Sequence, residues 1–535
     1  MQLGISKSVS KKQKESALIM RKQTKIAAVV SAAALLALGA SITSFAAAKG
    51  TWMMVDGEWY CYDKNGDAYE DKFCSSNGKE YYVGEDGQLV RSSWVDGTNG
   101  EHYFVNSSGA KITNDWRLTT PYDDDSADEE WYYFKADGKM ATNTKITYKG
   151  KTYFFDAEGK MLTGWVTADG TQVANEENKI DSGDTYYCGE DGARLEKTWI
   201  YTTEPTTEDA EADADENWYY LKSNGNPVVN KKQNNLKGQS YIFDEQGVML
   251  YGWVAKLATN SDATYAKIDK EGTENKLSSS EYEKIYFCGG EDDGHVKKNK
   301  WIKTWRPENT YDEDEDEDMY WYWIKKDGEV YVPSGSDAMA QKYKLGDGSM
   351  DKKGDEIGIA KYGVGSKDYF FNMNGEMMSQ FMDVISLNTN KIKQTGVYYL
   401  GGDDDGSMKT GTQTIKDENG DSYKFCFGTK EAEKGLGFTG NKGNKLYYNG
   451  LLLKAEDDKY AVATVDGHDF IVNANGSIQY SNIKYTEDKE TLIDASDSKK
   501  VVFNKASNDQ WKYSVTGLDT NNVPTINIKK VMDVK

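Results

Sequence analysis

One short pattern of apolar and polar positions recurs along most of the chain. Clear copies are YFFDAEGKM at residues 153–161 and YIFDEQGVM at residues 241–249. Aromatic residues favour a pleated, half-buried strand, and an Asp or Asn followed by Gly supplies the positive φ that a tight turn needs. Each copy therefore predicts a strand, a tight turn and a second strand.

The turn glycine sets a common register for the copies. An apolar residue lies four positions before it, and the Tyr six positions before it shares that face, because side chains alternate along a strand. This face is predicted to be the core, whereas the variable positions −5 and −7 are predicted to face solvent or a ligand. The Tyr and Gly pairs are Tyr60 and Gly66, Tyr81 and Gly87, Tyr103 and Gly109, Tyr132 and Gly138, Tyr153 and Gly159, Tyr186 and Gly192, Tyr219 and Gly225, Tyr241 and Gly247, Tyr322 and Gly328, and Tyr369 and Gly375.

A period of roughly 20 to 30 residues indicates a stack of supersecondary units, each too small to fold alone. A lone hairpin is marginal in water, but stacked hairpins bury a continuous aromatic column. The pattern predicts an all-β fold, a β-hairpin solenoid of aromatic repeats closed by a small C-terminal β cap.

After the N-terminal residues 1–48, the pattern divides the chain into three further segments. Residues 51–375 carry the regular repeats, residues 376–484 degenerate ones, and residues 485–535 a cap or a small β segment. Every third unit of the regular part inserts an acidic loop, at residues 123–130, 204–216 and 308–318. Each loop lies between two tryptophans, so the array is predicted to be built from triplets.

Residues 1–48 are typical of a targeting segment. Seven Lys and Arg residues precede an apolar run from Ile26 to Ile42, and small residues at 44–48 offer cleavage sites. This arrangement predicts a cleaved signal peptide and a secreted protein without stable membrane insertion. An uncleaved membrane anchor is the alternative, and Met20 is a second candidate start.

The net charge of −22 becomes −29 without residues 1–50. Such an excess repels phosphates, which argues against a nucleic-acid partner. The five cysteines are scarce and odd in number, so buried free thiols are expected. A bridge between Cys61 and Cys74 is the alternative.

Catalytic signatures are lacking. The three histidines, His102, His295 and His468, lie in different repeats without metal-ligand spacing. The sequence has no Gly-x-Ser-x-Gly elbow, phosphate loop or His-Glu-x-x-His motif, and no carboxylate pair is set apart for glycoside hydrolysis. We therefore expect no enzyme activity and no cofactor.

Tryptophans beside the acidic loops are the candidate ligand-binding residues. An indole face that the core does not use can stack on a sugar ring or hold a quaternary ammonium by cation–π attraction. The alternative is that these rings simply cover the hairpin core. The acidic loops would attract a cation, or hold Ca²⁺ loosely, although a run of like charge is more often a solvated loop. The candidates are Trp116, Trp131, Trp199, Trp218, Trp301, Trp321 and Met140.

The repeats resemble the cell-wall-binding (choline-binding or glucan-binding) repeats of Gram-positive surface proteins. Gly164-Trp165 and Gly252-Trp253 match the first half of that motif, and residues 131–134 (WYYF) with Gly138 and Met140 match the second half. Most copies have Thr, Ser, Glu or Asp at position −7, where the family's choline sites use an aromatic. The resemblance therefore implies sparse choline sites or a different glycan ligand.

Together these features predict a secreted, non-catalytic protein that binds bacterial cell-wall or capsular glycan, with choline as one candidate group. It would be associated non-covalently with the cell wall of a Gram-positive bacterium. The alternative is a structural or adhesive surface protein whose repeats form an elongated spacer. The sequence leaves the oligomeric state open.

Overall fold

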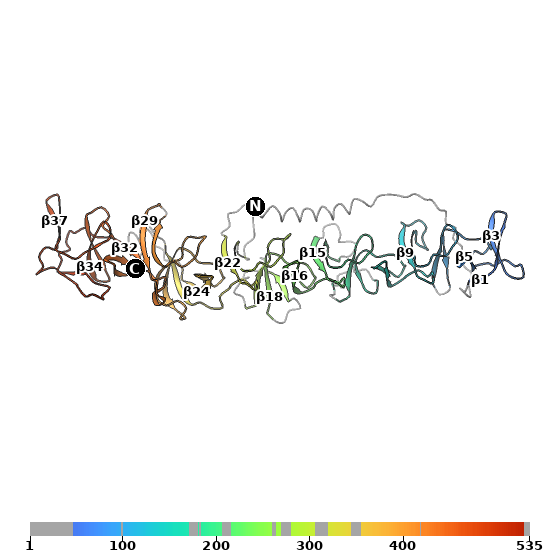
Figure 1. Cartoon of the computed structure of the whole chain (residues 1–535), viewed down its shortest axis with the longest axis horizontal. Coiled ribbons are helices and arrows are strands. Elements are labelled where there is room, and N and C mark those ends of the chain that lie inside the picture. The colour runs from blue at the N-terminus through green and yellow to red at the C-terminus, as the bar shows by residue number, and fades with distance from the viewer. Residues whose placement is uncertain are drawn as a thin grey trace. The chain divides into compact units, whose positions relative to one another are not determined.

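The computed structural model describes residues 47–97, 100–170, 180, 183–205, 216–258, 264–268, 280–304, 306, 319–343, 355–417 and 419–528. Short strands supply nearly all of its regular structure (Figure 1), with one 3₁₀ turn, η2 (Glu431–Glu433). This confirms the predicted all-β class. Across these ranges, no helix has both the length and the apolar character that crossing a bilayer requires. Of the predicted signal peptide, residues 1–48, all but the last two residues lie outside the described residues.

The chain divides into two compact units, the first within Met1–Gly252, Thr259–Ala266 and Cys288–His295. Its strands pair almost entirely as two-stranded antiparallel hairpins. The short strand β1 (Ala48–Lys49) also pairs in parallel with β4. The hairpins are β2 (Thr51–Val55) with β3 (Glu58–Tyr62), β4 (Lys72–Ser76) with β5 (Lys79–Val83), β6 (Ser93–Asp96) with β7 (His102–Val105), β8 (Asp115–Thr119) with β9 (Glu130–Phe134), β10 (Thr144–Tyr148) with β11 (Lys151–Phe155), β12 (Gly164–Thr167) with β13 (Thr185–Cys188), β14 (Thr198–Thr203) with β15 (Glu216–Leu221), and β16 (Lys231–Leu236) with β17 (Gln239–Phe243).

The second unit comprises Trp253–Ala258, Lys267–Phe287 and Val296–Lys535, and strand β19 (Tyr265–Lys267) falls across the division. It begins with two hairpins and continues with larger sheets. The hairpins are β18 (Trp253–Leu257) with β20 (Tyr282–Phe287) and β21 (Lys300–Thr304) with β22 (Tyr320–Ile324). Two five-stranded sheets follow, in the orders β25 (Lys367–Asn372), β24 (Ile357–Val364), β23 (Ala338–Tyr343), β26 (Phe381–Leu387), β27 (Gly396–Tyr399), and β28 (Gly411–Lys416), β29 (Ser422–Phe427), β32 (Leu451–Leu452), β31 (Lys445–Tyr448), β30 (Gly440–Lys442).

The last strands of the second unit pack on one another around a small core. Tyr485 and Ile493 are buried against Val462 and Ile471 of the preceding hairpin. These strands are β33 (Tyr460–Val465), β34 (His468–Asn473), β35 (Ile478–Gln479), β36 (Lys484–Glu487), β37 (Glu490–Asp494), β38 (Val502–Phe503) and β39 (Val515–Thr516).

The hairpin turn lies before the repeated aromatic strand, which corrects the sequence prediction. Strand β11 pairs with β10, and Lys149 (φ 48°) and Gly150 (φ 80°) close the hairpin. Two successive residues with positive φ are the signature of a type I′ turn. The Gly159 turn does form, but Met161 beyond it makes only a single bridge to Phe155. The pattern showed two turns, and the prediction assigned the hairpin to the wrong one.

The short segment after each glycine turn joins one hairpin to the one before it. The amide of Met161 donates to the carbonyl of Trp131 at 2.9 Å, and the amide of Leu89 donates to the carbonyl of Trp59 at 2.8 Å. Both connections run from position +2 of one repeat to position −7 of its predecessor. Successive hairpins are therefore held together by backbone bonds as well as by side-chain packing.

Both faces of the aromatic strand contribute to the core, which is a second correction. Most −4 residues and several −6 residues are buried as predicted, for example Tyr132 and Phe134, whereas Tyr81, Tyr153 and Tyr241 at −6 are only half-buried. Position −5, predicted to face solvent or a ligand, is also buried at Phe104, Tyr133 and Phe154. Each hairpin packs against a neighbour on either side, so both sides of its strands exclude water.

One glycine turn carries a titratable group that affects stability. The Asp244 carboxylate accepts bonds from the amides of Gln246 (2.9 Å) and Val248 (2.8 Å). Burial nevertheless raises the pKa of Asp244 to about 6, above its unfolded value of about 3.9. The folded state therefore holds the proton more tightly. The resulting stabilisation is complete below about pH 4 and is lost as the pH rises through the folded pKa.

We expect Asp244→Asn to raise the free energy of unfolding at pH 7.5 by about 1–3 kcal/mol and to change it little at pH 4. The amide keeps the acceptor oxygen, as Asn106 does in its own turn, where it accepts from Ser108 (2.9 Å) and Ala110 (3.1 Å). Urea unfolding at both pH values measures the difference. A variant no more stable than the wild type at pH 7.5 would contradict this account of the turn.

Candidate functional site

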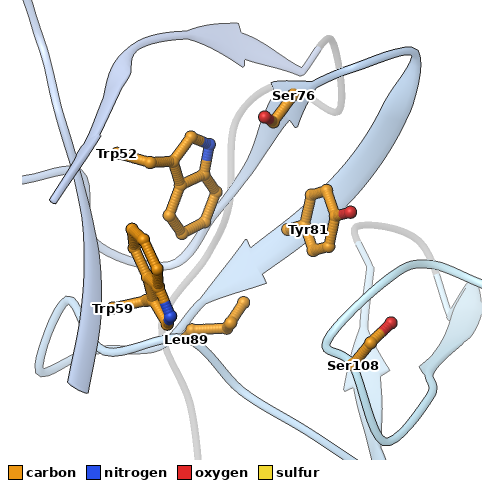
Figure 2. A pocket seen from close by; sticks show the side chains of 6 residues that line it. All are labelled: Trp52, Trp59, Ser76, Tyr81, Leu89 and Ser108. Carbon is orange, nitrogen blue, oxygen red and sulfur yellow. The ribbon is translucent and has the colours of Figure 1, made fainter. Parts of the chain in front are cut away.

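Two strands of one hairpin and the tail of the next surround a small open space at the start of the first unit. Trp52 on β2 and Trp59 on β3 face Tyr81 on β5, and Leu89 closes the lower edge in the view of Figure 2. The backbone amide of Leu89 donates a hydrogen bond to the carbonyl of Trp59, and this bond places the Leu89 side chain there. With Ser76 and Ser108 at the rim, the space measures about 230 Å³.

The same constellation recurs three times further along the chain, and we call the four sets cages 1 to 4. Each combines the Trp at the start of a hairpin, the Trp at position −7, and the residues at −6 and +2 of the next repeat. In every cage, the amide of the +2 residue donates to the carbonyl of the −7 Trp at 2.8–2.9 Å. Cage 1 is Trp52, Trp59, Tyr81 and Leu89; cage 2 is Trp116, Trp131, Tyr153 and Met161; cage 3 is Trp199, Trp218, Tyr241 and Met249; cage 4 is Trp301, Trp321, Tyr369 and Met377.

In cages 2 and 3 the rings stand roughly perpendicular to one another. In cage 2, the centroids of Trp116 and Trp131 are 6.3 Å apart at 84°, and those of Trp116 and Tyr153 are 4.8 Å apart at 70°. Cage 3 reproduces this with 6.3 Å at 85° and 4.8 Å at 67°. In cages 1 and 4, the three aromatic walls and one apolar side chain border a concave space. Such aromatic walls attract a cation through the ring quadrupoles.

Cage 4 differs from cage 1 in having charged groups at its rim. Lys367, Asp404 and Asp405 line the cleft, whose volume is about 370 Å³. Asp404 accepts bonds from Lys303 at 2.7 Å and from the Trp321 indole at 3.0 Å, and these bonds lower the pKa of its carboxyl. The rim therefore holds the Trp321 ring in place while offering both signs of charge.

The structure brings the six predicted tryptophans together in pairs. Trp116 lies with Trp131, Trp199 with Trp218, and Trp301 with Trp321, each pair in one cage. Trp131 is the most open of them, with 43 % of its surface exposed. The other five are half-buried, so each indole has a face in the core and another in a cage.

Met140 packs in a different cluster from Trp131. It is 5 % exposed, as is Met249 of cage 3, and lies among Phe104, Tyr132 and Phe134. The methionine that meets Trp131 is Met161, one repeat later, because the +2 residue bonds to the hairpin before its own. The sequence interpretation paired Trp131 with the +2 residue of its own repeat.

Sequence reasoning also missed cage 1 and the tyrosine walls of every cage. Trp59 occupies position −7, as Trp131 does, but no acidic loop accompanies it, and the loops had guided the choice. The tyrosines at −6 were assigned wholly to the core. A search for Trp at −7, followed by Tyr and an apolar +2 residue in the next repeat, would have found all four cages.

Between the cages, the protein places its own cations over the equivalent rings. Lys111 is at position +2 of its repeat, and its Nζ lies 4.9 Å from the Phe73 ring and 5.4 Å from the Tyr103 ring. Arg194, also at +2, has its Cζ 5.3 Å from the Tyr186 ring. In these repeats position −7 is Glu80, which pairs with Lys111, or Thr152, instead of Trp. The same repeat position thus holds either an internal cation or the floor of an open cage.

A further set of equivalent positions is filled by an aromatic ring. Trp94, His102, Tyr132 and Met140 correspond to a cage, and Tyr122, which directly precedes the acidic loop at 123–130, occupies it. The Tyr122 ring stacks on His102 at 3.8 Å and 19° and lies 6.0 Å from Trp94. The Trp94 indole donates to the carbonyl of Thr120 at 2.9 Å, which anchors the loop. The residue that precedes this acidic loop therefore fills the position of a cage.

Removing this ring should create a new site. We expect Tyr122→Ala to bind one more equivalent of tetramethylammonium than the wild type, because Trp94, Tyr132 and Met140 would then line an open space. The new site should be weaker than cages 1 to 4, since His102 replaces the −7 Trp. Tyr122→Phe, which keeps the ring, is the control. Unchanged stoichiometry in Tyr122→Ala, measured by calorimetric titration, would contradict the assignment.

Other chemistry has little support among the described residues. Within them, no three His, Cys, Asp or Glu side chains gather closely enough to hold a metal ion. The acidic loop at 123–130 is described, and its Asp124 accepts bonds from Ser126; most of the loops at 204–216 and 308–318 lies outside the described residues. All five cysteines are buried thiols.

Comparison with known proteins confirms the resemblance of the repeats. Residues 126–165, which include Trp131, Tyr153 and Met161 of cage 2, match the family model described as "Choline-binding repeat". A glucosyltransferase-S of Streptococcus mutans is 30 % identical over 200 residues, which are 37 % of this chain and 11 % of that enzyme. The chain thus spans about a tenth of the length of this curated relative.

Solved structures similar to this chain include two proteins of Streptococcus pneumoniae. The modular autolysin LytC is 18 % identical, covers 62 % of this chain with 52 % of its own length, and gives a TM-score of 0.32. Choline binding protein F is 17 % identical, covers 82 % of this chain with its whole length, and gives a TM-score of 0.25.

Proposed function

We propose that this protein is a secreted, non-catalytic binder of bacterial cell-wall or capsular polymers. It holds cationic, choline-type groups of those polymers in cages 1 to 4. The observation that carries the proposal is the fourfold recurrence of one constellation, with two Trp, one Tyr and one apolar residue. Core packing alone gives no reason for Trp to recur at an open −7 position.

Charge supports a cationic ligand. The walls of the cages are uncharged side chains, and cage 4 adds Lys367, Asp404 and Asp405 at its rim. The chain carries a net charge of −22, which raises the local concentration of cations and disfavours nucleic acid. Lys111 and Arg194 show that the same repeat position accommodates a cation over aromatic rings. A quaternary ammonium fits better than a primary one, because it has no N–H groups that need hydrogen-bond partners.

Several weak sites suit a polymer. Each exposed or partly desolvated cation–π contact contributes about 0.5–2 kcal/mol, so a single cage gives modest affinity. A polymer that engages several cages at once gains through effective concentration. The match of residues 126–165 to the choline-binding repeat supports this ligand class. A neutral glucan stacked on the same indoles is the second candidate, favoured by the similarity to the glucosyltransferase.

Retention on purified, choline-bearing cell wall tests the proposal. We expect free choline to release the bound protein and soluble glucan to leave it bound. Release by glucan but not by choline would move the ligand to the neutral sugar class. Failure to bind choline-bearing walls, choline-free walls and glucan alike would contradict a binding function and favour a spacer.

A further inference from the structure

Two of the five cysteines lie together, unlike the other three. Cys61 on β3 and Cys74 on β4 belong to one small core cluster with Val83, and both are 0 % exposed. Each thiol is close enough to the other to affect its pKa. Gly50, which follows the predicted signal peptide, packs against the pair: a Cβ added there would come within 2.4 Å of the Cys61 sulfur.

The pair lies beside cage 1. Cys61 is the strand partner of Trp52, and Cys74 is the strand partner of Tyr81. Trp52 and Tyr81 are two walls of cage 1, with ring centroids 5.7 Å apart at 71°. They come from different hairpins, so the geometry of cage 1 depends on how the first hairpin is held against the second.

Cys61 and Cys74 are both free thiols in this structure, and we propose that their oxidation to a disulfide fixes the first hairpin to the second and preorganises cage 1. A thiolate of one cysteine attacks the disulfide of an exchange partner, forms a mixed disulfide and expels one partner thiolate. The second cysteine then attacks the mixed disulfide, closes the Cys61–Cys74 bond and expels the second partner thiolate. Two thiol protons are lost, and the exchange partner, an oxidised dithiol or glutathione disulfide, takes up the two electrons.

The fold dictates when this exchange occurs. Burial raises the pKa of both thiols, and neither is accessible in the folded protein. The thiolate is the reactive form, so the folded, reduced pair exchanges slowly. The bond therefore forms while the first two hairpins assemble, before the cluster closes.

Thiol counting on the full chain tests the bond itself. The protein is refolded in a glutathione redox buffer, unfolded without reduction and alkylated. Its mass is then measured by mass spectrometry. We expect three alkylated cysteines before reduction and five after it, with one linked peptide pair containing Cys61 and Cys74. Five alkylated cysteines without reduction, or a linkage that involves Cys188, Cys288 or Cys426, would overturn the proposal.

Amide hydrogen exchange tests the effect on the hairpin. A bond closing a loop of this length should slow exchange of β2 and β3 by roughly 100-fold in the oxidised protein relative to the reduced protein. Cys74→Ala should exchange at the faster rate in either buffer. Equal rates in oxidised and reduced wild type, with the bond present, would show that it does not hold the hairpin and would overturn that part.

The effect on cage 1 rests on the proposed function. Oxidation should strengthen tetramethylammonium binding at cage 1 by a few-fold and leave the affinity of cages 2 to 4 unchanged. The indole NMR signals of Trp52 and Trp59 report binding at cage 1. Equal affinity in both states would refute the preorganisation, whereas absence of binding at all four cages would refute the proposed function and leave the disulfide standing.

Discussion

Replacing Trp59, Trp131, Trp218 and Trp321 together by Ala is expected to lower retention on choline-bearing cell wall at least 100-fold. Each substitution removes one wall of one cage, and a desolvated cation–π contact is worth up to about 2 kcal/mol, or roughly 30-fold in affinity. Because a polymer engages several cages, the losses compound. The fold should survive, since each −7 indole is exposed or half-buried. Pull-down at graded protein concentration measures the change.

A control for this variant is Tyr480→Ala. Tyr480 is 44 % exposed and stacks on Tyr513 in the C-terminal segment, outside the four cages. The Tyr480→Ala variant should bind the cell wall as the wild type does. Full retention of the fourfold variant, with its fold intact, would favour the spacer alternative over a ligand-binding role for the indoles.

Phe155→Ala is expected to cause the largest loss of stability among the single substitutions considered. Phe155 is 0 % exposed and packs against Tyr133 and against Trp116 of cage 2, with ring centroids 6.3 and 5.5 Å apart. Emptying such a position costs about 3–5 kcal/mol, because the surrounding side chains relax only in part. The same cavity removes the support of Trp116, so cage 2 should lose its ligand.

Hydrogen exchange is the suitable readout for Phe155→Ala, because stacked repeats open locally. Protection should fall mainly in β8 to β11 and much less in the second unit. Phe155→Leu, which keeps most of the apolar volume, should cost roughly 1 kcal/mol. Wild-type protection of β8 to β11 in Phe155→Ala would show that this ring does not hold the repeat together.

Local patterns predicted the class of fold but not the way in which repeats connect. The Tyr at −6 and the apolar residue at −4 identified the core face, as Tyr132 and Phe134 show. Burial of Phe154 at −5 was not predicted, because a strand pattern shows one face at a time and the covering hairpin comes from elsewhere in the chain. The larger sheets from β23 onward depend on pairings between distant strands, which periodicity does not encode.

The sequence pointed to the tryptophans of the candidate site but not to the Tyr and Met residues that complete each cage. Trp116 and Trp131 were paired because an acidic loop separates them in the sequence. Tyr153 and Met161 belong to the same cage only because the Met161 amide bonds to Trp131 one repeat earlier. That bond is a tertiary contact, and nothing near Met161 in the sequence signals it.

Internal filling explains why open cages are sparse. Lys111, Arg194 and Tyr122 occupy positions that correspond to cages, each with a group that satisfies the rings. A repeat therefore becomes a binding site when position −7 is Trp and position +2 of the next repeat is neutral. The residues at these two positions therefore distinguish repeats with an open cage from repeats that are filled internally.

Calorimetric titration with choline and with its neutral isostere, 3,3-dimethyl-1-butanol, tests the central claim most directly. The two molecules share one shape and differ in the charge of the head group, so the comparison isolates cation–π attraction in the cages. We predict that choline saturates four sites and that the isostere binds at least tenfold more weakly at each, a difference of about 1.4 kcal/mol. Equal binding of the two molecules, or no choline binding to a folded protein, would contradict the account.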